Sequence, residues 1–330
     1  MRVSEMKKIM DAKPKGGTVT DDLRPVTFDQ IVGQASAVSQ LRLLTAAARG
    51  RNEALTHILI DGPPGLGKTT MAGAVANAMG GKLYVTTGQS VGLEQLGKIL
   101  STLPAGTIFM IDEIHGLSVK AETMLLGAME DGVVDMTTPV GPERRAVKPF
   151  TLVGATTAPG DLSEPLKTRF GHQLQLNYYS VGDMIDIVAQ SAERLGMDIG
   201  AGAVSDIAER ANGTPRTANR FLLNVRDYAQ VISPEMMISS GTTEKAFEFF
   251  EIDEAGLMPR DRQYVMTMYE RFNGGPVGGE NLAVALGMDV RTVQSDIEPL
   301  LMRLQLIVRA PRGRLLTDAG RAFAQQLLGL

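Results

Sequence analysis

The stretch that most constrains the fold of this chain is residues 62–69, which read Gly-Pro-Pro-Gly-Leu-Gly-Lys-Thr. This spacing of Gly, Lys and Thr is that of a phosphate-binding loop, whose glycines let successive backbone N–H groups point at phosphate oxygens. Such a loop follows a strand and begins a helix. The apolar residues 57–60 predict a buried parallel strand, and the Ala- and Met-rich residues 71–79, followed by two glycines, predict the helix. We therefore expect a nucleotide site, in which Lys68 reaches the β and γ phosphates and the Thr69 hydroxyl binds Mg²⁺.

Composition excludes several classes of protein. The chain has no cysteines, which rules out disulfides and Cys-based metal sites and suits a reducing compartment. The first 15 residues are polar and lack the apolar core of a secretory signal, and no apolar run is long enough to span a membrane. We therefore expect a soluble, cytoplasmic protein without a membrane partner. Because the net charge is −4, any contact with nucleic acid must come from a local basic patch.

Beyond the loop, predicted strands alternate with predicted helices. Strands are expected over 82–86, 107–111 and 150–155, and helices over 93–103 and 119–130. This alternation is typical of an α/β fold, in which a parallel sheet has helices on both faces.

The strands stop after about Ser180, and the rest of the chain has two parts. Apolar residues at helical spacing predict a small all-helical bundle, and the last part combines predicted helices with two short strands, as a winged helix does. We divide the 330 residues into a flexible tail over 1–20, an α/β nucleotide-binding domain over 21–180, an all-helical domain over 181–252 and a winged-helix domain over 253–330.

A second chemical signature follows the predicted strand at 107–111. Two carboxylates end this strand, and we expect Asp112 to hold Mg²⁺ and Glu113 to act as the general base that activates the attacking water. The alternative is an acidic turn without a role, which the phosphate-binding loop upstream disfavours. His115 is either an exposed loop histidine or a nucleotide sensor.

Three further residues are candidates for contact with the γ-phosphate. Thr156 ends the strand predicted at 150–155, where its hydroxyl would lie near the attacking water, and Thr157 is the less favoured choice. Arg216 follows Pro215 at a predicted helix start, from which it would bend over the phosphates. Arg169 is expected past the last strand of the sheet, where it would project into a neighbouring subunit and stabilise transition-state charge.

The winged-helix domain carries a basic cluster with a single acidic residue, Asp318. Arg312 and Arg314 flank a glycine at the predicted hairpin tip, a geometry that suits phosphate contacts in a DNA groove. Winged helices also bind proteins, but the charge density favours DNA. The cluster consists of Arg303, Arg309, Arg312, Arg314 and Arg321.

The combined motifs resemble those of the RuvB family of AAA+ ATPases over about residues 23–317. The shared motifs in the first domain include Leu-Arg-Pro at 23–25, the loop at 62–70, Asp-Glu-Ile-His at 112–115, Ala-Met-Glu-Asp at 128–131, Gly-Ala-Thr-Thr at 154–157 and Arg-Phe-Gly at 169–171. The more specific motifs come later in the chain: Gly-Thr-Pro-Arg at 213–216, Val-Arg-Asp-Tyr-Ala-Gln at 225–230, Gly-Gly-Pro-Val-Gly at 274–278 and Pro-Arg-Gly-Arg at 311–314.

The resemblance implies an AAA+ domain, a helical lid domain and a winged helix, assembled as a homo-hexameric ring. Such a ring uses ATP and Mg²⁺ to move double-stranded DNA at a four-way junction during recombination and repair. The resemblance makes Arg169 an arginine finger acting in trans, Thr156 the first sensor and Arg216 the second. The residues expected at DNA are Arg309, Arg312 and Arg314. Those expected around the nucleotide are Arg24, Ile31, Val32, Gly62, Pro63, Pro64, Gly65, Leu66, Gly67, Lys68, Thr69, Thr70, Tyr179, Pro215 and Arg216.

The chain departs from the family pattern in the β-hairpin that grips the junction-binding protein RuvA. Residues 132–148, from Gly132 to Lys148, are a few residues short, and Thr137 and Thr138 stand where apolar tip residues are expected. Their hydroxyls would cost desolvation in an apolar groove, which puts the RuvA partner in doubt. Ile31, Gly116 and Ala158 also replace residues typical of the family. These departures predict a divergent member, of phage or mobile-element origin, that keeps its motor and changes its coupling.

Two other functions remain as alternatives to a DNA translocase. One is an ATP-switched DNA-binding regulator that does not translocate, which Glu113 disfavours because a switch need not hydrolyse ATP quickly. The other is an AAA+ loader or protein remodeller, which the Arg-rich wing disfavours.

Overall fold

The computed structural model describes residues 23–138, 141–232 and 237–329. The tail expected over 1–20 lies outside the described residues. The described chain forms two compact units, one made of residues 23–187 and 214–216, the other of 188–213 and 217–329. None of the described helices is long and apolar enough to cross a membrane.

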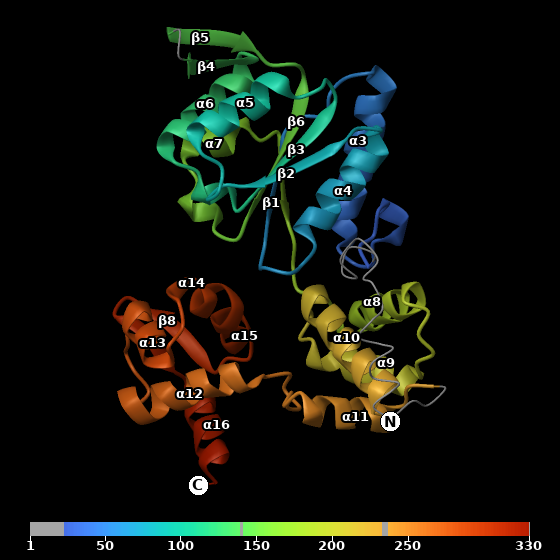
Figure 1. Ribbon diagram of the computed structural model, residues 1–330, viewed down its shortest axis with the longest axis vertical. Helices are drawn as coiled ribbons and strands as arrows, with labels where there is room; N and C mark the ends of the chain where they lie inside the picture. Colours follow the sequence, from blue (N-terminus) through green and yellow to red (C-terminus); the bar gives the residue numbers. More distant parts are fainter. Residues whose placement is uncertain (1–22, 139–140, 233–236, 330) are drawn as a thin grey trace, which may run out of the picture. The chain divides into compact units, whose positions relative to one another are not determined.

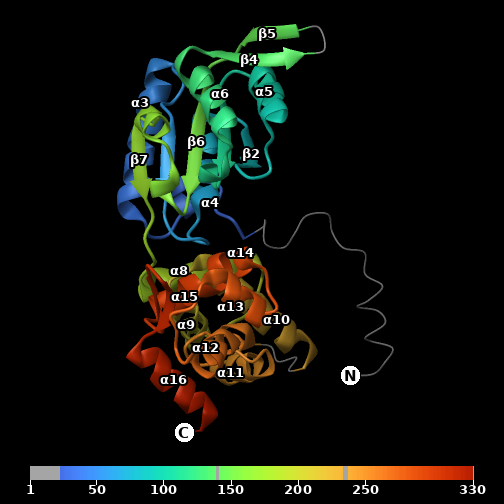
Figure 2. The ribbon, with the colours of Figure 1, turned by 90° about the vertical axis from the view of Figure 1, so that its left-hand side faces the viewer.

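The first unit is an α/β fold built on a five-stranded parallel sheet (Figures 1 and 2). Helices α3 and α4 lie on one face of the sheet, and α5, α6 and α7 lie on the other (Figure 1). Its elements are η1 (Phe28–Gln30), α3 (Ala35–Arg51), β1 (Ile58–Asp61), α4 (Lys68–Met79), β2 (Leu83–Thr87), α5 (Leu93–Thr102), β3 (Thr107–Asp112), η2 (Ile114–Gly116), α6 (Val119–Glu130), β4 (Val133–Thr138), β5 (Gly141–Ala146), β6 (Phe150–Thr156), η3 (Pro159–Asp161), α7 (Glu164–Arg169) and β7 (His172–Gln175).

The strand order places the chemical motifs at one edge of the sheet. The order is β2-β3-β6-β1-β7, so β6 lies between the strand that leads into the phosphate-binding loop and the strand that ends in the two carboxylates. In the parallel register Asp61 is paired with Thr156, and Ile111 with Gly154. The carboxyl ends of β1, β3 and β6 therefore meet, as they do at the ligand-binding edge of open α/β sheets.

Alternation of side chains along the strands builds a core on each face of the sheet. Leu59, Phe109 and Leu152 are almost fully buried and belong to the apolar cluster that α5, α6 and α7 complete. Ile58 and Ile60 point to the opposite face, where α4 covers the sheet. The strand before the phosphate-binding loop, β1, and the helix after it, α4, are thus both held in place by packing in the core.

The sheet contains one strand that the sequence analysis missed. β7 follows α7 and pairs in parallel with β1, so Arg169 does not lie past the last strand of the sheet. It ends α7, between β6 and β7. The strand is short and polar because it lies at the sheet edge, with only Leu174 fully buried.

The second unit begins with the helical part of the chain. Phe221 and Phe247 are fully buried at its centre and meet edge to face at 5.6 Å. The helices are α8 (Val181–Arg194), whose first turns belong to the first unit, α9 (Ala201–Arg210), α10 (Pro215–Val231) and α11 (Ser240–Phe249).

The winged helix follows, and its long helix is not continuous. The helix over residues 290–303 is interrupted by a π-turn, in which the Glu298 N–H donates to the Val293 carbonyl, five residues back instead of the four of an α-helix. Pro299 follows directly and has no N–H to donate. The elements are α12 (Pro259–Phe272), α13 (Gly279–Leu286), α14 (Val290–Thr292), η4 (Val293–Ile297), α15 (Glu298–Arg303), β8 (Ile307–Ala310), β9 (Gly313–Leu316) and a final helix, α16 (Asp318–Leu328), that the sequence analysis did not predict.

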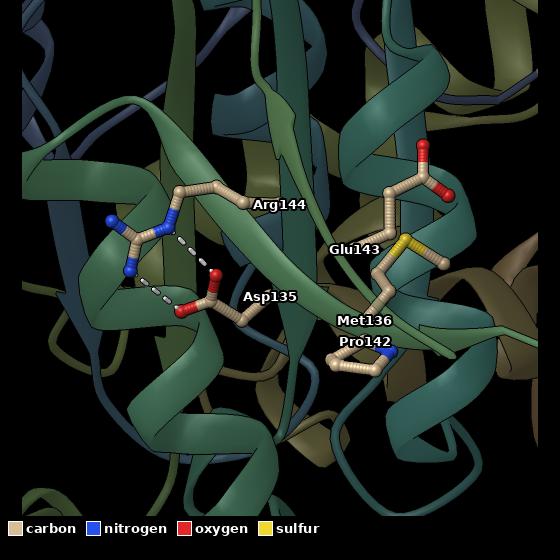
Figure 3. Close-up of a pocket in the computed structure, with 5 residues that line it drawn as sticks. All are labelled: Asp135, Met136, Pro142, Glu143 and Arg144. Atoms are coloured by element: carbon tan, nitrogen blue, oxygen red, sulfur yellow. Dashed lines mark hydrogen bonds and ion pairs between the residues drawn. The ribbon is translucent and has the colours of Figure 1, made fainter. Parts of the chain in front are cut away.

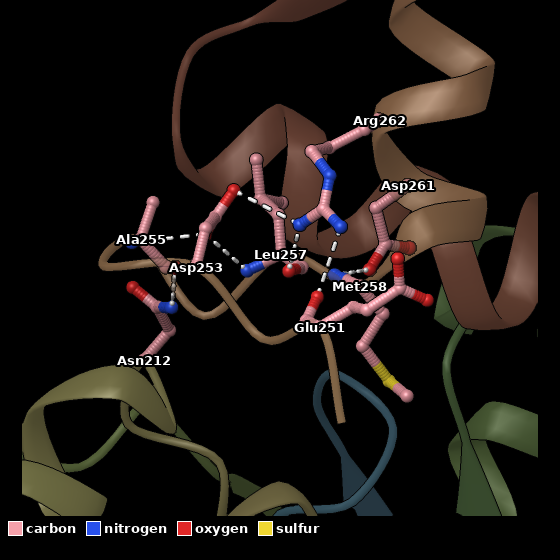
Figure 4. A network of polar contacts seen from close by, with 8 residues as sticks. All are labelled: Asn212, Glu251, Asp253, Ala255, Leu257, Met258, Asp261 and Arg262. Carbon is pink, nitrogen blue, oxygen red and sulfur yellow. Dashed lines mark hydrogen bonds and ion pairs between the residues drawn. The ribbon is translucent and has the colours of Figure 1, made fainter. Parts of the chain in front are cut away.

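Polar contacts fix the segment that joins the helical part to the winged helix (Figure 4). The Asp253 carboxylate accepts from the backbone N–H groups of Ala255 and Leu257, at 3.0 and 2.8 Å. Arg262 donates to the carbonyls of Glu251 and Leu257, each at 2.9 Å. Asn212, after α9, donates to the Ala255 carbonyl at 2.7 Å. These backbone groups of the linker are thus paired with protein groups from both sides of it.

Candidate nucleotide-binding and catalytic site

The phosphate-binding loop leaves β1 with backbone conformations that favour glycine. Gly62 has φ +146°, and a Cβ there would lie 2.5 Å from the Leu176 carbonyl oxygen. The Gly62 N–H donates to the Thr156 carbonyl at 3.2 Å, which ties the loop to the end of β6. The loop thus starts from a backbone position fixed by its neighbours.

Lys68 begins α4 and is buried. Its ammonium donates to the carbonyls of Gly62, at 2.7 Å, and Pro63, at 3.1 Å. Burial lowers the pKa of Lys68, while the carboxylates of Glu113 and Asp112 act in the opposite direction. The loop therefore holds a pre-positioned cation beside the helix N-terminus, where phosphate is favoured.

Asp112 and Glu113 follow each other at the carboxyl end of β3. Burial and the neighbouring Glu113 charge raise the pKa of Asp112, and the Lys68 charge opposes this shift. Glu113 has φ +46°, a left-handed conformation that is uncommon outside glycine. Backbone strain of this kind is often found at functional sites.

Hydroxyl and imidazole groups surround Glu113. Thr157, which the sequence analysis disfavoured, donates from its hydroxyl to Glu113 Oε2 at 3.0 Å. Thr156 is fully buried, and its hydroxyl accepts from the Ala158 N–H at 3.0 Å. His115 Nδ1 lies 2.9 Å from the Thr156 hydroxyl and 3.3 Å from Glu113 Oε2. Both threonines therefore lie at the site, but it is Thr157 that touches the carboxylate.

Arg216 lies against the phosphate-binding loop. Its backbone N–H donates to the Gly65 carbonyl at 3.4 Å, and its side chain is exposed. A Cβ at Gly65, where φ is +80°, would lie 2.9 Å from Thr214 Cγ2 and 3.1 Å from Arg216 Cβ. The segment 214–216 thus closes over the loop only because residue 65 has no side chain.

This close approach predicts that Gly65→Ala weakens ATP binding by about tenfold or more, since the new methyl group meets two neighbours in a strained conformation. Titration with a fluorescent ATP analogue measures the effect. Gly73→Ala is the matched control, because a Cβ there would meet nothing within 4 Å in the middle of α4. It should leave affinity unchanged and stabilise the helix. Wild-type affinity in Gly65→Ala would contradict the arrangement.

Tyr179 links the loop to the residues expected around the base. Its hydroxyl donates to the Leu66 carbonyl at 3.1 Å, and burial raises the pKa of Tyr179 to about 12. Its ring would lie 2.9 Å from a Cβ at Gly33, directly after Ile31 and Val32, which are half-buried. Arg24 is exposed at the start of the described chain.

Arg169 is held at the end of α7 by the residue that follows it. The Phe170 ring packs on Gly154 of β6, where a Cβ would lie 2.8 Å from the ring. The Arg169 guanidinium forms an ion pair with Glu130, at the end of α6, and both side chains are partly exposed. This partner could not be predicted from the sequence, because no local pattern connects the ends of two helices.

Comparisons with known proteins agree with this geometry. Three family models match consecutive parts of the chain: the P-loop domain of the Holliday junction DNA helicase RuvB over residues 23–176, the RuvB AAA lid domain over 179–253 and the RuvB C-terminal winged helix domain over 254–325. The solved structure of Thermotoga maritima RuvB, a Holliday junction branch migration motor, is 37% identical, with a TM-score of 0.83, and the match covers 93% of this chain and 98% of that one. The chain belongs to the RuvB family. A Lys-to-Arg variant of the Thermotoga protein matches with a TM-score of 0.84 at the same identity.

Membership of the RuvB family confirms the predicted fold class and implies nucleotide binding by the P-loop domain. The residues present fit a magnesium nucleotide. No group of three or more His, Asp or Glu side chains in the described part of the chain could hold a metal by itself. Mg²⁺ bound with a nucleotide needs fewer protein ligands, because the phosphates and water supply the others. Thr69, at the start of α4, and Asp112, at the end of β3, would hold it, and the ion would neutralise charge on the phosphates.

The hairpin of this RuvB family member is charged on its exposed surface (Figure 3). Asp135 and Arg144 form a two-bond ion pair at 2.8 and 3.0 Å, and Glu143 and Arg145 form another at 2.8 and 2.9 Å. Asp135, Met136, Pro142, Glu143 and Arg144 line an open pocket of about 320 Å³. The side chains of Thr137 and Thr138, on which the doubt about RuvA rested, lie outside the described residues.

The arginines expected at DNA lie in the wing, which consists of β8, β9 and the turn between them. Arg312 is exposed at the turn between them. Arg309 and Arg314 both form ion pairs with Glu298, which is fully buried. This carboxylate was not predicted as a partner of the wing, because it lies in the preceding helix, α15.

Proposed function

We propose that this chain is an ATP-driven translocase that moves double-stranded DNA and so drives branch migration of four-way junctions in recombination and repair. The observation that carries the proposal is the site at the carboxyl edge of the sheet, where Lys68, Asp112 and Glu113 meet in a chain with all three RuvB-family domains. ATP with Mg²⁺ is the cofactor, and a homo-hexameric ring is the working form.

Each residue has a distinct part in this proposal. Lys68 neutralises charge on the β and γ phosphates, and Glu113 accepts the proton of the attacking water while Thr157 and His115 orient its carboxylate. Thr156 holds His115 in place, Arg216 senses the nucleotide from the lid, and Arg169 enters the site of the adjacent subunit. The hydrogen bond from Thr157 and the position of His115 Nδ1, 3.3 Å from Glu113 Oε2, support this orientation of Glu113.

The decisive experiment is a branch-migration assay on a synthetic four-way junction, run with ATP and with a non-hydrolysable analogue. We expect ATP-dependent conversion of the junction to duplex products, and none with the analogue. DNA-stimulated hydrolysis without conversion, whether or not a RuvA protein is added, would overturn the proposal and favour the DNA-binding regulator or loader. If the junction is converted to duplex products only when RuvA is added, RuvA is a required partner of this chain.

A further inference from the structure

The wing contains a buried charge network that DNA contact does not by itself explain. Glu298 is fully buried at the end of the π-turn, and both of its carboxylate oxygens are occupied. Oε1 accepts from Arg314 Nε at 2.8 Å and from the Tyr264 hydroxyl at 3.2 Å. Oε2 accepts from Arg309 Nε at 2.8 Å and from Arg314 at 3.3 Å. One carboxylate therefore joins α12, α15 and both strands of the wing.

Arg314 is the most enclosed arginine of this network. Its side chain is 15% exposed, against 49% for Arg309. A Cβ at Gly279, the first residue of α13, would lie 2.7 Å from the Arg314 guanidinium. The guanidinium therefore packs directly against Gly279, and a side chain there would displace it.

The backbone of Arg314 is fixed as well. Its N–H donates to the Val277 carbonyl at 2.8 Å, and its carbonyl accepts from the Val277 N–H at 3.0 Å. Gly313, next to it, has φ +128°, and a Cβ there would lie 2.3 Å from the Val277 carbonyl oxygen. Arg314 thus points into the domain, whereas Arg312, two residues earlier, lies exposed at the turn.

We propose that Glu298 and Arg314 are positioning residues, which lock the wing onto the helices of the winged-helix domain so that Arg312 is presented to the DNA backbone. The proposal rests on the proposed function, since it assumes that the wing contacts duplex DNA. It assigns Arg314 a different role from Arg312, although the two flank the same glycine.

The physical reason is the geometry of the ion pair. A guanidinium donates two parallel hydrogen bonds to a carboxylate and so fixes its orientation, whereas an ammonium acts as a point charge. A buried carboxylate that loses such a partner is left unsatisfied, and the hairpin it holds is released. A DNA phosphate at the exposed turn accepts either cation. Lysine should therefore replace arginine at position 312 but not at position 314.

The test compares Arg314→Lys with Arg312→Lys in the full chain, by titration of a short mixed-sequence duplex well below the melting temperature of each variant. We expect Arg314→Lys to bind about tenfold more weakly and Arg312→Lys to stay within about twofold of wild type. Equal affinities for the two lysine variants would overturn the positioning role, because both arginines would then be plain phosphate contacts.

For a second variant, Glu298→Gln, simple electrostatics and the positioning role predict opposite changes in DNA affinity. Glu298→Gln removes a negative charge from a DNA-binding domain, so simple electrostatics predicts tighter binding. Positioning predicts binding about tenfold weaker, because the wing loses its anchor. A lower melting temperature with unchanged or tighter DNA binding would show a purely structural role and overturn the proposal. If Glu298→Gln does not fold, the lysine pair decides.

Arg312→Gln separates failure of this inference from failure of the proposed function. We expect it to reduce the slope of log affinity against log salt by about one, the loss of one phosphate contact. An unchanged slope and an unchanged affinity would show that the wing does not contact DNA. The DNA contact assumed in the proposed function would then be wrong. A reduced slope together with a harmless Arg314→Lys would overturn only the positioning role.

Discussion

Glu113→Gln binds ATP as tightly as the wild type but hydrolyses it about a thousandfold more slowly, the effect expected when a general base is replaced by its amide. The amide keeps the shape of the side chain and can still contact Thr157 and His115, which lie 3.0 and 3.3 Å from Glu113 Oε2. It cannot accept the proton of the attacking water. Steady-state phosphate release, together with titration of a fluorescent nucleotide, separates the two effects.

Glu94→Gln is the matched control for this change. Glu94 is an exposed residue of α5 that pairs with Lys98 one turn later, so its amide should leave hydrolysis unchanged. If Glu113→Gln kept more than about a tenth of the wild-type rate, the carboxylate would not be the general base.

Arg169→Ala should lower hydrolysis by about a thousandfold as well, since an arginine finger supplies transition-state stabilisation of this size. A finger in trans makes a further prediction that a residue acting in cis does not. In a ring with head-to-tail interfaces, an Arg169→Ala subunit still contains Glu113, and a Glu113→Gln subunit still contains Arg169. One kind of interface between the two variants therefore has both groups. An equal mixture of the two inactive variants should recover up to about a quarter of the wild-type rate, because that share of interfaces contains both groups.

The mixture is compared with each variant alone at the same total concentration, after subunits have been allowed to exchange. Arg51→Ala serves as the control, because Arg51 is also a half-exposed arginine with a carboxylate partner, Glu53. Full activity of Arg169→Ala alone would show that Arg169 is not an arginine finger. If the two inactive variants formed rings together and the mixture stayed inactive, Arg169 would act in cis, on the nucleotide bound by its own subunit.

Local patterns explain why so much of the catalytic unit could be predicted from the sequence. The phosphate-binding loop, β3 and α6 are contiguous stretches whose hydrophobic pattern and end residues define them, and α6 begins and ends at the predicted residues, Val119 and Glu130. The two carboxylates follow a buried strand at once, so their place at the sheet edge follows from the strand.

Features that depend on contacts between distant segments were not predictable. β7 is a four-residue polar edge strand, and nothing in its own sequence shows that it pairs with β1. Thr156 and Thr157 are adjacent hydroxyls, and only the end of β6 decides which one turns toward Glu113. The inward orientation of Arg314 depends on Glu298, 16 residues earlier, and on the absence of a side chain at Gly279. In each case the deciding partner is remote in sequence.

The central claim is that ATP is hydrolysed at a junction between two copies of this chain and that the released energy moves duplex DNA. The most direct test measures the hydrolysis rate per subunit over a range of protein concentrations, with and without duplex DNA, alongside sedimentation of the same samples. We predict that the rate per subunit rises as the monomer assembles and rises again when duplex is added. A monomer that hydrolyses ATP at the full rate, unaffected by concentration or DNA, would contradict the account.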